Sequence, residues 1–262
     1  MKLTVLVDNN TYIDQYYLGE PAFCCLLEAE GKKILFDTGY SDIFLTNAEK
    51  MGIDLSDLTH IVLSHGHNDH TRGLLFLPPS GAQLVAHPDC FLPKCVADED
   101  IGAPFSVQEA ARRWDVLLSR EPVALTDHLL WLGEIPRVTD FECKTPIGIC
   151  GGKEDYLLDD TALVWRREDG IFLITGCSHS GICNIVEYAK KVCGDDRILG
   201  ILGGFHLLED GEQLDKTVAY LADLDMKMLY PCHCVCLPAK AKMLARMPVT
   251  EVGVGMTLEL YR

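Results

Sequence analysis

The chain has 262 residues, 48% of them hydrophobic and 24% charged, so it is long enough for one domain with a large core. Its formal net charge of −16 argues against a nucleic-acid partner, because nucleic acid is held chiefly by Lys and Arg. The sequence shows no basic amphipathic helix of the kind that binds a membrane surface. It also shows no long apolar run and no amino-terminal pattern that would favour membrane insertion or export. We therefore expect a cytoplasmic protein whose twelve cysteines are mostly free, buried thiols. No particular oligomeric state is indicated.

Short apolar runs alternate with helical patterns along the chain. In the first half, strands are predicted over residues 3–7, 23–28, 33–36, 61–64 and 83–86, with helices over 41–51 and 71–77. In the second half, strands are predicted over 161–165, 171–175, 198–202, 227–230 and 251–260, with helices around 182–192 and 214–221. This alternation predicts helices outside two sheets in a single domain, residues 1–262.

The segment from residue 87 to 155 is the least regular part and holds six of the twelve prolines. Long irregular segments in compact domains are usually lids or binding loops, so we interpret it as an insertion that shapes a substrate pocket. The alternative is a structural crossover between the two halves.

Four potential metal ligands lie close together directly after the predicted strand that ends at residue 64. They are His65, His67, Asp69 and His70. Residues two apart in an extended segment point to the same side, so His65 and His67 can bind one cation. Asp69 and His70 then face elsewhere and can bind a second cation, about 3.5 to 4 Å from the first. The alternative, a merely solvated polar loop, is disfavoured by this density of ligand residues.

Three later histidines also follow apolar strands. His179 lies in a loop of small residues, His206 follows Gly203-Gly204-Phe205, and His233 lies between Cys232 and Cys234. Because α/β sites form at strand ends, all three can converge on the first cluster. For each of them, a histidine that is satisfied by hydrogen bonds in the core is the alternative interpretation.

The H-x-H-x-D-H motif of residues 65–70 resembles the metallo-β-lactamase superfamily. Together with residues 133–137, 176–181, 203–207 and 231–234, it is similar to the branch of dihydropterin ribofuranosylaminobenzene phosphate synthase-like metallo-hydrolases. This resemblance implies an αββα sandwich, and a phosphorylated or pterin-like small molecule as substrate. It also implies that His233 is a ligand and that Asp37, in a D-T-G motif, anchors a ligand histidine. For Asp37, an aspartate that forms the turn at the end of a strand is the alternative.

The ligand sets that we expect are His65, His67 and His179 for one ion, and Asp69, His70 and His233 for the other. Zinc is the first expectation for this histidine-rich set, with iron or manganese as alternatives. A metal-bound hydroxide would attack a small ester, phosphoester or related substrate, while Asp69 orients the nucleophile or accepts its proton. His206 is either a ligand or a donor to the transition state. We therefore predict a dinuclear metal-dependent hydrolase, with a di-iron redox protein and a non-catalytic metal-binding protein as the alternatives.

Other details of the site are left open by the sequence. The bridging ligand is Asp159, Asp160, His206 or none, because Cys177 stands where many relatives have the bridging aspartate. Cys232, Cys234 and Cys236 have the wrong spacing for a structural zinc site, so we expect them to be buried thiols around His233. Arg72 is either an anion contact or an exposed helix arginine.

Overall fold

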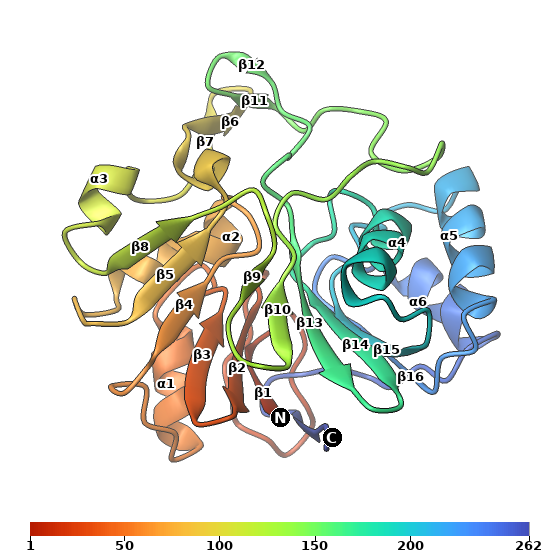
Figure 1. The fold of residues 1–262 in the computed structure, drawn as a ribbon, viewed down its shortest axis with the longest axis horizontal. Coiled ribbons are helices and arrows are strands. Elements are labelled where there is room, and N and C mark those ends of the chain that lie inside the picture. Colours follow the sequence, from red (N-terminus) through yellow and green to blue (C-terminus); the bar gives the residue numbers. More distant parts are fainter. Residues whose placement is uncertain (262) are drawn as a thin grey trace.

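The computed structural model, which describes residues 1–261, is an αββα sandwich (Figure 1). Two sheets face each other in the middle, and helices cover the outer face of each (Figure 1). The two chain ends lie together at one end of the sandwich, and a small third sheet projects from the other (Figure 1). Among the described residues, no helix is both long enough and apolar enough to cross a membrane.

The first half of the chain, together with the C-terminal strand β17, builds the seven-stranded sheet, whose order is β17-β1-β2-β3-β4-β5-β8. Its strands are β1 (Lys2–Val7), β2 (Cys24–Ala29), β3 (Lys32–Phe36), β4 (His60–Val62), β5 (Gln83–Ala86), β8 (Asp115–Leu118) and β17 (Thr257–Glu259). Its covering elements are α1 (Ile43–Lys50), α2 (Asn68–Thr71), the 3-10 helices η1 (Arg72–Leu75) and η2 (Pro88–Phe91), and α3 (Val107–Ala110). Strands β3, β4, β5 and β8 run parallel, so the loops after β3 and β4 emerge at the same edge of the sheet.

The second half builds the six-stranded sheet, in the order β16-β15-β14-β13-β10-β9. Its strands are β9 (Val123–Ala124), β10 (Leu129–Trp131), β13 (Ala162–Arg167), β14 (Gly170–Thr175), β15 (Ile198–Gly203) and β16 (Met228–Pro231). Its helices are α4 (Ile182–Cys193), α5 (Glu212–Ala222) and α6 (Leu237–Leu244). Because β14, β15 and β16 are parallel, the loops that carry His179, His206 and His233 also share one edge.

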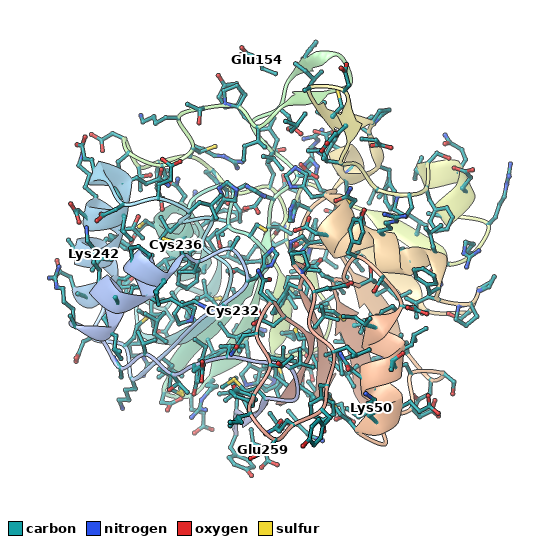
Figure 2. The ribbon with its side chains drawn as sticks, turned by 180° about the vertical axis from the view of Figure 1, so that it is seen from behind. Lys50, Glu154, Cys232, Cys236, Lys242 and Glu259 are labelled. Atoms are coloured by element: carbon teal, nitrogen blue, oxygen red, sulfur yellow. The ribbon has the colours of Figure 1, made fainter. Side chains whose placement is uncertain are left out.

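Residues 87–155 contribute to all three sheets. They supply β8 to the first sheet and β9 and β10 to the second. They also form the whole of the small sheet, whose order is β12-β11-β6-β7. Its strands are β6 (Lys94–Val96), β7 (Glu99–Asp100), β11 (Ile149–Cys150) and β12 (Lys153–Glu154). Seen from behind, Glu154 on this sheet and Glu259 on β17 mark opposite ends of the molecule (Figure 2).

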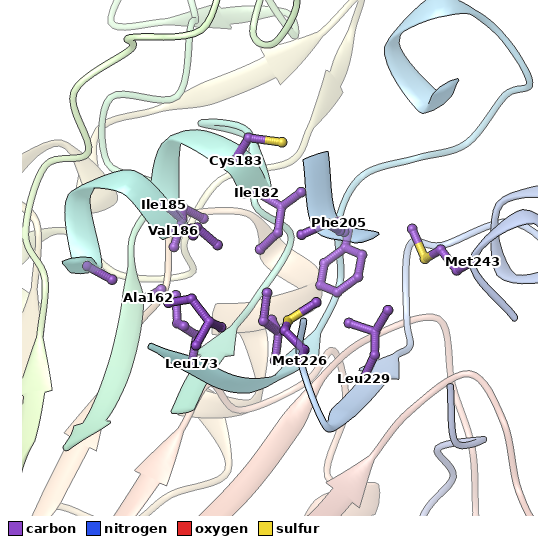
Figure 3. Packing of buried hydrophobic residues seen from close by; sticks show 14 of the residues in the cluster. Ala162, Leu173, Ile182, Cys183, Ile185, Val186, Phe205, Met226, Leu229 and Met243 are labelled. Atoms are coloured by element: carbon purple, nitrogen blue, oxygen red, sulfur yellow. The ribbon is translucent and has the colours of Figure 1, made fainter. Parts of the chain in front are cut away.

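Three apolar clusters correspond to the three interfaces of the four layers. One lies between the first sheet and its helices and includes Phe44 and Leu84. The second lies between the two sheets and includes Trp131 and Trp165. The third lies under α4, α5 and α6, where Ile182, Ile185 and Val186 of α4 pack near Ala162 and Leu173, while Phe205 lies with Leu229 and Met243 (Figure 3). Burial of these residues removes most of the apolar surface of each element from water, which is the main favourable contribution to folding.

The secondary structure departs from the sequence-based prediction at several places, including residues 87–155, where the short elements β6 to β12, η2 and α3 were not predicted. The predicted helix over residues 71–77 is instead the short α2 followed by the 3-10 turn η1, because the ligand-rich segment bends tightly there. The predicted strand over residues 251–260 is confined to β17, Thr257–Glu259. Helix α6 was not predicted, since Pro238 at its start and Pro248 after its end look like loop signals.

Candidate functional site

Three histidines from two loops, His65, His67 and His179, bring potential ligand atoms together, and we call them the first group. His65 and His67 lie between β4 and α2, and His179 follows β14. One ring nitrogen of each lies within 4.8 Å of the others. His65 Nε2, His67 Nε2 and both nitrogens of His179 are buried without a hydrogen-bond partner among residues 1–261. Buried polar atoms are rarely left unpaired, so these nitrogens fit a bound cation.

The second group consists of Asp69, His70, Cys177 and His233, whose ligand atoms also lie within 4.8 Å of one another. His70 Nε2 is 3.2 Å from His233 Nε2 and 3.5 Å from Asp69 Oδ2. His233 Nε2 is 3.3 Å from the same carboxylate oxygen. The ring centroids of His65 and His70 are 4.3 Å apart, so the two groups are direct neighbours. The structure thus brings together every histidine and aspartate that the sequence analysis assigned to the two ions.

Cys177 is the addition that the sequence analysis did not assign as a ligand. Its Sγ lies 3.1 Å from His70 Nε2, and its side chain is buried. Burial raises the pKa of the Cys177 thiol well above its usual value, with Cys234 adding to the shift. A nearby cation would favour the thiolate, which is the form of cysteine that binds metals.

Protonation of the histidines and of Asp69 follows from burial and from their neighbours. Burial lowers the pKa of His65 and His179 well below the usual value, and that of His67 to about 4, so these rings are neutral. Burial alone would raise the pKa of Asp69, but His70 and His233 outweigh it and hold the pKa well below its usual value. Burial alone would lower the pKa of His70, but Asp69 and Asp37 outweigh it and raise that pKa well above its usual value, so a bound metal ion would replace a proton on this ring. Neutral imidazoles and an ionised carboxylate are the states that bind a metal ion.

For His65, His70 and His233, hydrogen bonds fix which ring nitrogen faces the site. Asp37 Oδ2 is 2.7 Å from His70 Nδ1, as expected for an anchoring carboxylate, and it also accepts a 2.7 Å bond from Ser64 Oγ. The same Ser64 oxygen is 2.9 Å from His65 Nδ1, and Asn9 Oδ1 is 3.0 Å from His233 Nδ1. Because Nδ1 of each of these rings is engaged, Nε2 is left to face the other ligand atoms.

The two ligand loops approach each other closely. A Cβ on Gly176 would lie 2.1 Å from Ser64 Oγ, so only glycine permits this distance between the loops after β4 and β14. Positive backbone φ angles occur at Asp37 (56°), Ser178 (58°), His206 (44°) and His233 (50°). Non-glycine residues adopt this conformation at a cost, and such strain collects at functional sites.

Neither Asp159 nor Asp160 occupies the bridging position that the sequence analysis left open. Asp159 Oδ2 accepts a 2.8 Å hydrogen bond from the Gly66 amide, and its other oxygen is 3.0 Å from Lys94 Nζ. Asp160 accepts hydrogen bonds from the amides of His179 and Ser180. Both carboxylates therefore hold ligand loops and belong to neither group of ligand atoms.

His206 lies beside the first group and at the edge of a cavity. Its ring is 4.3 Å from that of His179, and it lines a cavity of about 430 Å³ together with residues 207–214 and Thr145. Its backbone N–H donates a 3.2 Å hydrogen bond to Cys234 Sγ. His206 belongs to neither group of ligand atoms, so its position suits contact with a substrate better than coordination.

The three cysteines around His233 are buried to different degrees. Cys232 is fully buried, as expected, whereas Cys234 and Cys236 are only partly buried. Cys234 Sγ approaches the carbonyl oxygen of Cys177 at 3.7 Å. All twelve cysteines lie in the described part of the chain and are free, and six of them are buried. Figure 2 shows Cys232 and Cys236 labelled at the two ends of this short segment.

Several contacts of the site could not be found from the sequence. Asp8 Oδ1 accepts a 2.9 Å bond from the His233 amide, and Asn9 contacts the ring of the same residue, although both lie more than two hundred positions away. Lys94 is fully buried behind the first ligand loop. Arg72 is exposed and stacks on Tyr40, 4.5 Å from the ring centroid, which matches the interpretation as a surface arginine.

The sequence of this chain is similar to those of known proteins. Residues 18–89 match the sequence model of the Metallo-beta-lactamase superfamily. The chain is 34% identical over 248 residues to an uncharacterized protein of Methanocaldococcus jannaschii, covering 92% of this chain and 93% of that protein. It is 28% identical over 258 residues to the 7,8-dihydropterin-6-methyl-4-(beta-D-ribofuranosyl)-aminobenzene-5'-phosphate synthase of the same organism, covering 89% and 87%.

A crystal structure described as a metal-dependent hydrolase of the beta-lactamase superfamily matches over 100% of both chains, with a TM-score of 0.87 and 30% identity. This similarity extends beyond the segment matched by the sequence model and includes the loops of His179 and His233. The chain therefore belongs to the metallo-β-lactamase superfamily.

Proposed function

We propose that this protein is a cytoplasmic, dinuclear metal-dependent hydrolase that acts on a small ester, phosphoester or related substrate. The observation that carries the proposal is the pair of adjacent ligand groups, in which buried imidazole nitrogens converge without hydrogen-bond partners among the described residues. His65, His67 and His179 would hold one ion. Asp69, His70 and His233 would hold the other, with the Cys177 thiolate as a further ligand.

The donor set favours zinc. Imidazole and thiolate suit zinc, and manganese and magnesium prefer carboxylate and carbonyl oxygen, of which the second group offers only Asp69. Iron remains compatible with the same donors. When bound, such ions polarise a substrate oxygen and lower the pKa of water, so the reaction needs no Ser or Cys nucleophile.

Two side chains have positions from which they could serve the reaction. Asp69 is partly exposed, and its Oδ2 lies within 3.5 Å of both His70 and His233, so it can orient a nucleophilic water or accept its proton. His206 lines the neighbouring cavity of about 430 Å³, from which its ring can donate a hydrogen bond to the substrate.

The substrate class rests on similarity. One relative is named as a synthase of a dihydropterin ribofuranosylaminobenzene phosphate, which is a phosphorylated pterin derivative. The net charge of −16 does not exclude a small anionic molecule of this kind, because a single local site would suffice to bind it. A di-iron redox protein on the same scaffold is the second candidate, favoured by the free thiols of Cys177, in the second group, and of Cys234 beside it.

Metal analysis tests both candidates. Protein purified without added metal should contain close to two ions per chain, predominantly zinc for the hydrolase and iron for the redox protein. A screen of phosphoesters, lactones, thioesters and pterin derivatives then identifies the substrate. A protein that holds only traces of metal after reconstitution would refute both candidates.

A further inference from the structure

Two adjacent buried aspartates lie between the loops that carry the first group. Asp159 and Asp160 are separated from the start of β13 only by Thr161, and both are buried. Asp159 Oδ2 accepts a hydrogen bond of 2.8 Å from the amide of Gly66, which separates His65 from His67. A Cβ at Gly66 would lie 2.2 Å from the carbonyl oxygen of Cys90, so the loop is confined from that side as well.

Asp160 makes the equivalent contacts with the second loop. Its Oδ1 accepts a 3.0 Å bond from the His179 amide, and its Oδ2 accepts bonds of 2.9 Å and 2.5 Å from the amide and hydroxyl of Ser180. The next residue, Thr161, donates its amide to the carbonyl oxygen of Ser64 at 2.9 Å. Asp159 and Thr161 thus contact the His65–His67 loop, and Asp160 between them contacts the His179 loop.

A buried lysine compensates the charge of Asp159. Lys94 Nζ lies 3.0 Å from Asp159 Oδ1 and 2.8 Å from Asp155 Oδ2, and its side chain is fully buried. Lys94 begins β6 of the small sheet, so the pair connects that sheet to the first ligand loop. Removing the cation would leave two buried carboxylates unpaired, which is costly.

We infer that Asp159 and Asp160 are positioning residues, which fix the His65–His67 loop and the His179 loop at the spacing that one metal ion requires. The inference rests on the proposed function. Each aspartate acts through backbone amides, so neither touches the ion. Loss of such outer contacts typically weakens metal affinity by about 10- to 100-fold.

The chain offers a matched control in Asp155. Asp155, like Asp159, pairs with Lys94 through one oxygen and accepts a backbone amide, that of Leu157, through the other. In Asp155→Asn and Asp159→Asn, the side chain loses its charge and keeps one acceptor oxygen, so its NH2 group faces either the Lys94 ammonium or the backbone N–H and repels it. Only the second substitution affects a ligand loop. Both variants therefore weaken the pairing with Lys94, and they differ in the backbone amide that is involved, that of Leu157 or that of Gly66.

Cobalt(II) binding followed by visible absorption tests the inference, with His65→Ala and His233→Ala used to assign the two binding steps. Asp159→Asn and Asp160→Asn should weaken the step of the first group by about 10- to 100-fold and leave the other within about threefold. Asp155→Asn should change neither step. In the metal-free protein, hydrogen exchange of the Gly66 amide should accelerate in Asp159→Asn, and that of the His179 amide in Asp160→Asn.

Equal cobalt affinities in Asp159→Asn, Asp160→Asn and Asp155→Asn would overturn the inference, as would unchanged exchange at Gly66 and His179. A wild-type protein that binds no cobalt would instead refute the proposed function. The amide exchange data, which need no metal, distinguish these two failures. Circular dichroism of each variant shows whether a general loss of structure accounts for an effect.

Discussion

At the scale of single residues, Asp69 combines two roles in the proposed site. It is the only carboxylate in either group, and His70 and His233 keep its pKa well below the usual value despite burial. Asp69→Asn keeps the shape but loses the charge, so we expect an intact fold and a rate that falls by more than about a hundredfold. Circular dichroism, metal content and turnover on the substrate from the screen measure this. A near-normal rate with one metal would show that the second ion is dispensable.

Asp225→Asn provides the control for this substitution. Asp225 is exposed in the turn between α5 and β16, and its backbone φ of 51° suits asparagine equally well. The same change of a carboxylate to an amide should therefore leave metal content and rate unchanged.

His233 and Cys236 lie three positions apart, and we assign a ligand role to His233 and a packing role to Cys236. His233 Nε2 faces Asp69 and His70, whereas Cys236 is the residue before α6 and belongs to neither ligand group. We expect His233→Ala to lose about one equivalent of metal and most activity, and Cys236→Ala to keep both. Elemental analysis of the two variants decides this. Comparable losses would indicate a thiolate site around Cys236 instead.

At the scale of elements, a contact between two turns joins the sheets at a distance from the site. Glu30, in the turn between β2 and β3, accepts hydrogen bonds from the His128 amide and ring, at the start of β10. Burial would raise the pKa of Glu30, but its hydrogen bonds to Thr126 and His128 lower it to about 2. A carboxylate whose pKa is lowered on folding stabilises the folded state at pH values above the pKa that the same group has in the unfolded chain.

This contact therefore predicts a specific pH dependence. The contribution of this contact to the free energy of unfolding should be fully present above about pH 4.5 and be lost as the pH falls toward about 2. Glu30→Gln should remove about 1 to 2 kcal/mol at neutral pH and flatten the profile in that window, measured by urea unfolding. Glu28→Gln is the control, because Glu28 forms only a half-exposed surface pair with Lys2. Parallel pH profiles of Glu30→Gln and wild type would contradict the assignment.

The elements also show why the sequence predicts some of the site and not the rest. His65 and His67 fall in one group and Asp69 and His70 in the other because local chain geometry alone separates them. The convergence of the loops after β14 and β16 follows from parallel strands that end at one edge. Cys177 and the Asp159–Asp160 pair were not foreseen in their observed roles, since these depend on contacts between distant segments.

At the scale of the whole molecule, the site lies where the two halves of the sandwich meet. Asp69 and His70 come from the first sheet's loops, while Cys177, His179 and His233 come from those of the second. Each group of ligand atoms contains residues from both halves. Metal binding would therefore stabilise the packing of one half against the other, in addition to serving chemistry.

Removal of metal should consequently lower the thermal stability of the entire protein. An ion present at about a thousand times its dissociation constant stabilises the folded state by about 4 kcal/mol. For a chain of this length, that corresponds to a fall in Tm of roughly 10 °C when a chelator strips the sites. Differential scanning calorimetry before chelation, after it and after reloading with zinc measures the change.

The double variant His65→Ala/His233→Ala is the control for this experiment, because it lacks one ligand in each group and is expected to retain no metal, which elemental analysis checks. Its Tm should be insensitive to the chelator and lie near that of the stripped wild-type protein. An unchanged wild-type Tm after complete removal of metal would contradict the prediction. In that case the interface between the two sheets, with Trp131 and Trp165 at its centre, would hold the halves together without help from the ions.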